Sequence, residues 1–125
     1  MKKGQITYRH LSDVIKRDIV SGNWDLKAKL PSARELAEQY EVNANTVKRA
    51  LVSLQKEGLI DSKRTTGKYI TGNKLLVSSI RENEARKLAL EFVNKLSEIG
   101  VRPDELAMMF RDPEIPYLES TEGGI

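Results

Sequence analysis

The chain has 125 residues, of which 39% are hydrophobic and 31% are charged, which is typical of a globular protein and excludes a disordered chain. The absence of cysteine excludes disulfides and thiolate metal sites, and no apolar run approaches the roughly 18 residues of a membrane helix. The net charge of +3 is divided unevenly: residues 1–74 carry 15 Lys and Arg against 8 Asp and Glu, whereas residues 75–125 carry 6 against 10. The basic first part suits a polyanionic partner.

The first predicted helix covers residues 7–21. Leu11, Ile15 and Ile19 recur at helical spacing, so they share one apolar face. Gly22 ends the pattern. We therefore expect an amphipathic helix that buries this face, followed by an irregular connector.

Two further helices are predicted, and each begins with a capping residue. Ser32, followed three residues later by Glu35, forms a capping box that predicts a helix over residues 33–40. Asn43 is a favourable N-cap for a third helix over residues 44–57. The short stretch between these two helices leaves room only for a tight turn, which is typical of a helix-turn-helix.

A short β-hairpin is predicted after Gly58, a residue that suits the left-handed conformation at the end of a helix. Residues 59–63 and 68–71 each alternate weakly between apolar and polar side chains. The tip between them is basic and consists of Arg64, Thr65, Thr66 and Gly67. Three helices and a hairpin in this order predict a winged helix-turn-helix.

The third helix is the candidate element for reading DNA. In this motif its first turns enter the major groove, where Asn can pair with adenine and Arg with guanine. Lys and Arg can instead neutralise backbone phosphates. The polar residues expected on the groove side are Asn43, Asn45, Thr46, Lys48 and Arg49. Asn and Thr are poor helix formers, and a helix needs only one cap, so their concentration here favours DNA contact over an ordinary solvated face.

The second half is expected to form a long helix over residues 75–99 and a short helix after Pro103. One stripe of the long helix is too apolar to face water, and it consists of Leu88, Phe92, Leu96 and Ile99. This stripe can pack back on the winged helix or form a homodimer interface, which is preferred because helix-turn-helix proteins commonly bind two half-sites. The predicted division is a DNA-binding domain (1–73), a dimerisation segment (74–111) and a mobile tail (112–125).

Three blocks of the sequence carry a resemblance to a known family. They are residues 30–38 (LPSARELAE), 42–50 (VNANTVKRA) and 54–60 (LQKEGLI). In order and spacing they resemble the DNA-binding domain of the GntR family of bacterial regulators over about residues 8–72, and the Asn-x-Asn-Thr-Val version resembles its YtrA-like branch. The resemblance implies a two-helix dimerisation segment and a repressor of a nearby operon, often one that encodes a transporter.

The resemblance also implies which residues contact a palindromic operator in double-stranded DNA. The groove-facing and phosphate-facing positions of the family fall on Arg34, Asn43, Asn45, Thr46, Lys48 and Arg49. Its wing position falls on Gly67 within the predicted tip, with Thr65, Thr66 and Lys68 around it. Ala44 departs from the family, since many members have arginine there, so the operator sequence should differ from theirs.

Other functions are less well supported by the residues. The only histidine, His10, has no apparent nucleophile or base beside it, and neither a phosphate loop nor metal-ligand spacing is present, so no enzyme and no cofactor is expected. An RNA-binding winged helix would need aromatic side chains to stack unpaired bases, and residues 43–57 contain none. A protein-interaction module, the main alternative, would need an apolar or acidic outer face over residues 43–57.

No residue indicates a small-molecule effector, and without a signal peptide the expected location is the cytoplasm.

Overall fold

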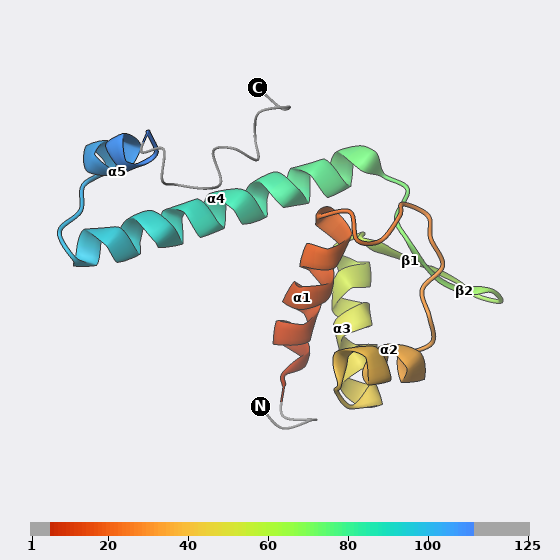
Figure 1. The fold of residues 1–125 in the computed structure, drawn as a ribbon. Coiled ribbons are helices and arrows are strands. Elements are labelled where there is room, and N and C mark those ends of the chain that lie inside the picture. The colour runs from red at the N-terminus through yellow and green to blue at the C-terminus, as the bar shows by residue number, and fades with distance from the viewer. Residues whose placement is uncertain (1–5, 112–125) are drawn as a thin grey trace. The chain divides into compact units, whose positions relative to one another are not determined.

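The computed structural model describes residues 6–111, so the tail predicted over residues 112–125 lies outside the described residues. The helices are α1 (Tyr8–Val20), α2 (Ala33–Tyr40), α3 (Ala44–Lys56), α4 (Lys74–Glu98) and α5 (Pro103–Met109), and the strands are β1 (Ile60–Lys63) and β2 (Gly67–Ile70). This order confirms the predicted fold class, a mainly helical winged helix followed by a C-terminal helical segment (Figure 1). The chain forms two compact units that divide between Asn83 and Glu84, within α4.

The helices of the first unit begin where the sequence predicts because their caps form. At the start of α2, the Ser32 amide donates to the Glu35 carboxylate at 2.9 Å and the Glu35 amide donates to the Ser32 hydroxyl at 3.1 Å. These bonds complete the capping box and lower the pKa of Glu35. At the start of α3, the amide of Asn45 donates to Oδ1 of Asn43 at 2.7 Å. Both predicted caps are therefore confirmed.

One apolar core holds α1, α2, α3 and the hairpin together. Its buried members are Leu11, Ile15, Ile19, Leu30, Leu36, Ala37, Val42, Val47, Ala50, Leu51, Leu54, Leu59, Ile60 and Ile70. The apolar face predicted for residues 7–21 is thus confirmed. Since α3 contacts α1, α2 and β1, its buried side is covered by these elements and its opposite, mostly polar side faces solvent.

Tyr40, at the end of α2, is half-buried rather than buried as the helical pattern suggests. Its hydroxyl donates a hydrogen bond to Oδ2 of Asp18 at 2.7 Å, and Oδ1 of the same carboxylate accepts one from Asn23 at 3.0 Å. Burial, and then the bond to Asp18, raise the pKa of Tyr40 to about 12. The neutral phenol therefore ties α2 to the end of α1.

The hairpin joins the core through its base. β1 and β2 pair in antiparallel register with Ile60 opposite Ile70, and both side chains are 1% exposed. Residues 64–66 form the tip, whereas Gly67, which was predicted to belong to it, is the first residue of β2 and pairs with Lys63. The base of the wing is thus fixed while its tip extends into solvent.

The connector before α2 pairs with the wing, which the sequence analysis did not predict. Lys29 forms an isolated antiparallel bridge with Tyr69. Beside it, the amide of Leu30 donates to the carbonyl of Lys68 at 2.8 Å. The connector therefore runs along β2 and brings an additional lysine to the wing.

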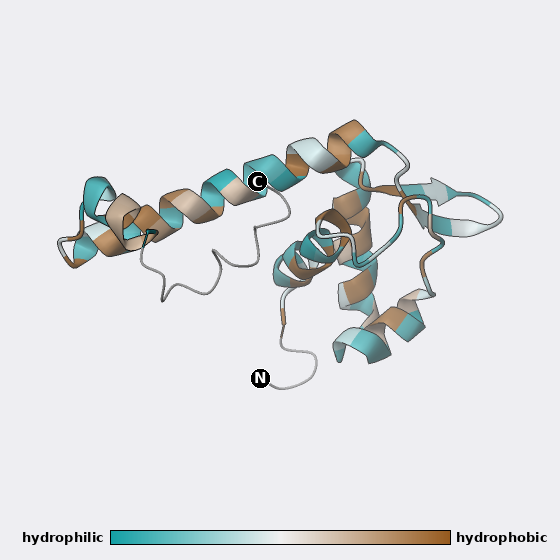
Figure 2. Ribbon diagram, turned by 45° about the horizontal axis from the view of Figure 1, so that its top comes forward, coloured by the Kyte–Doolittle hydropathy of each residue, from teal (hydrophilic) through white to brown (hydrophobic). Residues whose placement is uncertain are grey.

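The second unit has few buried side chains. The first turns of α4 still belong to the first unit, where Val77 and Ile80 pack against the core. Gly100, with φ +85°, follows the end of α4, and Pro103 begins α5, as predicted. Leu106 is buried, whereas apolar segments, brown in Figure 2, recur along α4 among polar ones. None of the helices within residues 6–111 is long and apolar enough to cross a membrane.

Candidate nucleic-acid interface

The outer side of α3 carries most of the predicted DNA-binding residues. Asn45, Lys48 and Arg49 are exposed, and Thr46 is half-buried. Asn43 is also exposed, but its side-chain oxygen is engaged as the helix cap. Its amide nitrogen is thus the part of this side chain that can donate to DNA.

Two residues of α3 that the sequence analysis missed lie on the same side. Val52 is 48% exposed and Lys56 is also exposed. Helical spacing could have identified them, since Val52 follows Lys48 by four residues and Arg49 by three. An exposed valine among cations and amides can contact the methyl group of thymine.

A hollow separates the start of α2, the middle of α3 and the wing. It is lined by Lys29, Leu30, Pro31, Ser32, Ala33, Glu35, Lys48, Leu51, Val52, Gly67 and Lys68. The ammonium group of Lys68 donates to Oε1 of Gln55 at 3.2 Å and to Oγ of Ser62 at 3.4 Å, which links the wing to α3. Arg34 is exposed on the first turn of α2 but does not line this hollow.

The wing tip presents the other predicted DNA-binding residues to solvent. The exposed side chains are Arg64, Thr65 and Thr66. Gly67 has φ +119°, and a Cβ atom at this position would lie 3.2 Å from Cε of Lys29. Only glycine adopts this φ readily, and its lack of a Cβ atom leaves room for the Lys29 side chain of the connector.

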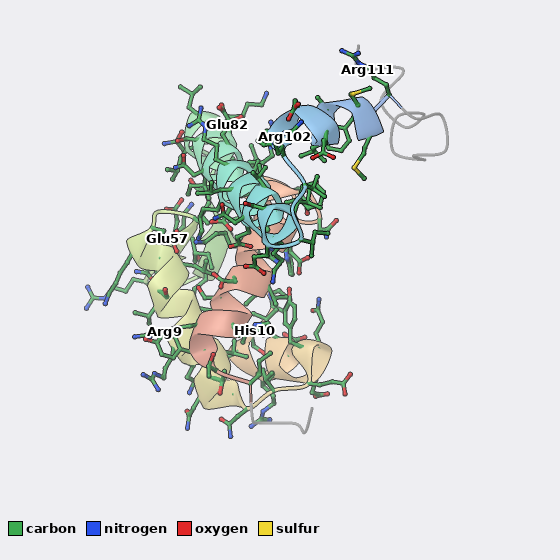
Figure 3. All side chains as sticks on the ribbon, turned by 90° about the vertical axis from the view of Figure 1, so that its left-hand side faces the viewer. Arg9, His10, Glu57, Glu82, Arg102 and Arg111 are labelled. Carbon is green, nitrogen blue, oxygen red and sulfur yellow. The ribbon has the colours of Figure 1, made fainter. Side chains whose placement is uncertain are left out.

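The start of α1 borders the same surface. Cζ of Arg49 lies 4.2 Å from the centroid of the Tyr8 ring, and Cζ of Arg9 lies 5.8 Å from it. Arg9 points toward α3, whereas His10, at the next position of the helix, points away from α3 (Figure 3). Tyr8 and Arg49 are far apart in the sequence, so no local pattern indicated this contact.

The combined surface runs from α1 across α3 to the wing, with cations from each element. Such an array can neutralise consecutive phosphates of a nucleic acid, while the amides of α3 can bond to base edges. Among residues 6–111, no cluster of histidine and carboxylate side chains could hold a metal ion.

A three-helix core, a hairpin beside the third helix and an exposed basic side on that helix define a winged helix-turn-helix, a class of DNA-binding domain (Figure 1). The model of the family described as bacterial regulatory proteins, gntR family, matches residues 7–70. This match covers about half of the chain, and the chain belongs to the GntR family of DNA-binding transcription regulators.

Relatives extend the similarity beyond the DNA-binding domain. The chain is 28% identical over 102 residues to YhcF of Bacillus subtilis, an uncharacterized HTH-type transcriptional regulator, covering 82% of this chain and 77% of YhcF. It is 38% identical over 66 residues to the repressor YtrA of the same organism, covering 53% of this chain and 51% of YtrA. A solved GntR family regulator from Listeria monocytogenes superposes with a TM-score of 0.76 at 31% identity, covering 83% of this chain and 91% of that one.

The chain spans about half the length of YtrA and less than a third of several other curated relatives. The similarity to those longer proteins covers 64 to 66 residues of this chain. The two relatives named above are described as a transcriptional regulator and a transcriptional repressor.

Proposed function

We propose that the chain is a homodimeric transcriptional repressor that binds an inverted-repeat operator in double-stranded DNA. Residues 1–73 are the proposed DNA-binding domain, and residues 74–111 the proposed dimerisation segment. The proposed DNA contacts are Arg34, Asn43, Asn45, Thr46, Lys48, Arg49, Arg64, Thr65, Thr66, Gly67 and Lys68. Repression is proposed because the relative YtrA is named a repressor. As in the resemblance noted above, the controlled operon is expected to lie nearby and to encode a transporter.

The continuity of the basic surface across α3 carries this proposal. Lys48 borders both the hollow toward the wing and a second hollow toward α1, and Arg49 borders the second hollow and a third at the start of α1. The major groove is about 12 Å wide and admits one helix, so cations on both sides of α3 can meet phosphates on both sides of the groove. A protein-binding surface would instead need an apolar or acidic centre.

Exposed apolar side chains of the second unit support the dimer. Leu88 and Phe92 are each 47% exposed and Ile99 is 75% exposed, while Leu96 is half-buried. Side chains of this kind on one stripe of a helix are costly to leave in water, and a second copy of the chain can cover them. Two joined copies can bind two half-sites about one helical turn apart, which gives an affinity that one module lacks.

The Phe92→Glu variant tests the dimer, with Leu75→Glu as the matched control. Leu75 lies within residues 74–111 but in the first unit and outside the stripe, and it is 83% exposed, so we expect it to accept the same charge without disturbing the stripe. Light scattering should give twice the chain mass of 14.1 kDa for the wild type and the control, and one chain mass for Phe92→Glu.

DNA binding by the same variants separates the two parts of the proposal. The wild type and Leu75→Glu should bind a duplex with two half-sites much more tightly than one with a single half-site, whereas Phe92→Glu should lose this preference. A wild type that is monomeric, or a Phe92→Glu variant that stays dimeric, would show that the stripe is not the interface.

A further inference from the structure

The aromatic ring of Tyr8 lies between two arginines at the start of α1. Cζ of Arg49 is 4.2 Å from the ring centroid, and Cζ of Arg9 is 5.8 Å away. Nε of Arg9 also donates a hydrogen bond to the Tyr8 hydroxyl at 3.4 Å. Neither Tyr8 nor Arg9 is among the DNA contacts proposed above, although Arg49 is.

The position of the ring bears on how Arg49 can act. Tyr8 is half-buried and packs against the core, whereas Arg49 is exposed. A guanidinium above an aromatic ring keeps its N–H groups free at its edges, where they can bond to a phosphate or a guanine. Because the ring restricts a long and otherwise mobile side chain, less entropy is lost when Arg49 binds DNA.

The charges around Tyr8 indicate an anionic ligand. Both guanidinium carbons lie within 6 Å of one ring, and no carboxylate within residues 6–111 forms an ion pair with either arginine. The hydrogen bond from Arg9, followed by the charges of both arginines, lowers the pKa of the Tyr8 phenol. Two neighbouring cations repel each other, and a phosphate that bonds to them relieves this repulsion.

The hollows on this surface connect the pair to the recognition helix. One hollow is lined by residues that include Tyr8, Lys48 and Arg49. The adjoining hollow is lined by residues that include Arg9 and Thr46. Tyr8 and Arg49 line both hollows, so the two arginines are continuous with the outer side of α3.

We propose that the start of α1 is part of the DNA-binding surface, where Arg9 binds a backbone phosphate and Tyr8 is a positioning residue that holds Arg49 toward the DNA. This inference rests on the proposed DNA-binding function. It assigns the phosphate contact to α1, an element outside the helix-turn-helix and the wing.

A double-mutant cycle tests the role of Tyr8. The operator selected from a random duplex library is titrated with the wild type, Tyr8→Leu, Tyr8→Phe, Arg49→Ala and the Tyr8→Leu/Arg49→Ala double variant. A cation–π contact at an exposed site is worth about 2- to 5-fold in affinity, so a dimer with two such sites should lose about 5- to 30-fold in Tyr8→Leu. Tyr8→Phe keeps the ring and should bind like the wild type, and Tyr8→Leu should have no further effect when Arg49 is absent.

An NMR measurement without DNA gives an independent readout. The Nε–Hε resonance of Arg49 should be shifted by the ring current in the wild type and in Tyr8→Phe, and it should return to an ordinary position in Tyr8→Leu. Unchanged thermal unfolding of the folded Tyr8→Leu protein, measured by circular dichroism, separates this effect from a loss of structure. A resonance that is the same in all three proteins would overturn the positioning role.

The phosphate contact of Arg9 is tested with a neighbouring control. Arg9→Ala should make the salt dependence of binding less steep, whereas His10→Ala, at the next position of α1 and outside the three hollows, should leave it unchanged. If the wild type binds its operator but Arg9→Ala and Tyr8→Leu bind equally well, or if the effects of Tyr8→Leu and Arg49→Ala simply add, the inference is wrong while the proposed function stands. If the wild type binds no duplex, both are wrong.

Discussion

Replacement of Lys48 by alanine offers the most quantitative test of the DNA-binding surface. Lys48 is exposed near the middle of the outer side of α3, where it borders the hollows on both sides of the helix. No carboxylate within residues 6–111 forms an ion pair with it. Alanine also favours the helix at least as much as lysine. The change therefore removes one cation from the surface and leaves the fold intact.

The expected magnitude follows from the release of counterions. Each phosphate contact contributes about 0.9 to the slope of log affinity against log salt concentration, and a dimer loses two contacts in Lys48→Ala, so the slope should fall by about 1.8. Between about 50 mM and about 200 mM salt, this difference corresponds to about 12-fold in affinity. The advantage of the wild type over the variant should shrink by that factor across this range.

Fluorescence anisotropy with a labelled operator, measured at several salt concentrations, gives both slopes. Arg17→Ala is the matched control because it also removes one exposed cation, in the last turn of α1, away from the proposed surface. Equal slopes for Lys48→Ala and the wild type would refute the phosphate contact. An equal decrease in Arg17→Ala would show that total charge, not position, sets the salt dependence.

Three further predictions follow from single contacts. Asn45→Ala should change which base pair is preferred at one position of each half-site, by about 1–3 kcal/mol in a competition assay, and an equal loss on all sequences would contradict base reading. Tyr40→Phe should lower the free energy of unfolding at neutral pH by about 1 kcal/mol in urea titrations, because Oδ2 of Asp18 loses the hydrogen bond from the Tyr40 hydroxyl. Since the pKa of Tyr40 is raised to about 12 from 10.0, this stabilisation should be complete below pH 10 and disappear as the pH rises toward 12. The free energy of unfolding of Tyr40→Phe should not show this decrease between pH 10 and pH 12. Gly58→Ala should cost about 1–2 kcal/mol, because Gly58 has φ +85° and the new Cβ atom would lie 3.0 Å from Cδ2 of Leu76; unchanged unfolding would contradict this strain.

Local signals explain why much of the fold could be predicted. The Ser32 and Glu35 pair and the cap at Asn43 each fix a helix start through bonds within three residues. Gly100, with its positive φ, marks the end of α4, and Pro103, with its restricted φ, marks the start of α5. Helical periodicity then determined which side of α3 is polar, and this was sufficient to place the candidate DNA-binding side.

The features that were missed depend on contacts between distant parts of the chain. The pairing of Lys29 with Tyr69 and the packing of Tyr8 against Arg49 join segments with no shared sequence pattern. Such contacts are set by how the elements pack, which periodicity does not describe. The individual DNA contacts and the dimer stripe around Phe92 are still predictions, because they depend on partners outside the chain.

Selection of bound duplexes from a random DNA library, with purified protein at near-physiological salt, tests the central claim most directly. A dimeric, sequence-specific regulator should enrich an inverted repeat whose half-sites lie about 10 base pairs apart, centre to centre. No enrichment, or binding that is lost at moderate salt on every sequence, would contradict the account. That result would leave only a nonspecific basic surface and would favour a protein-interaction module.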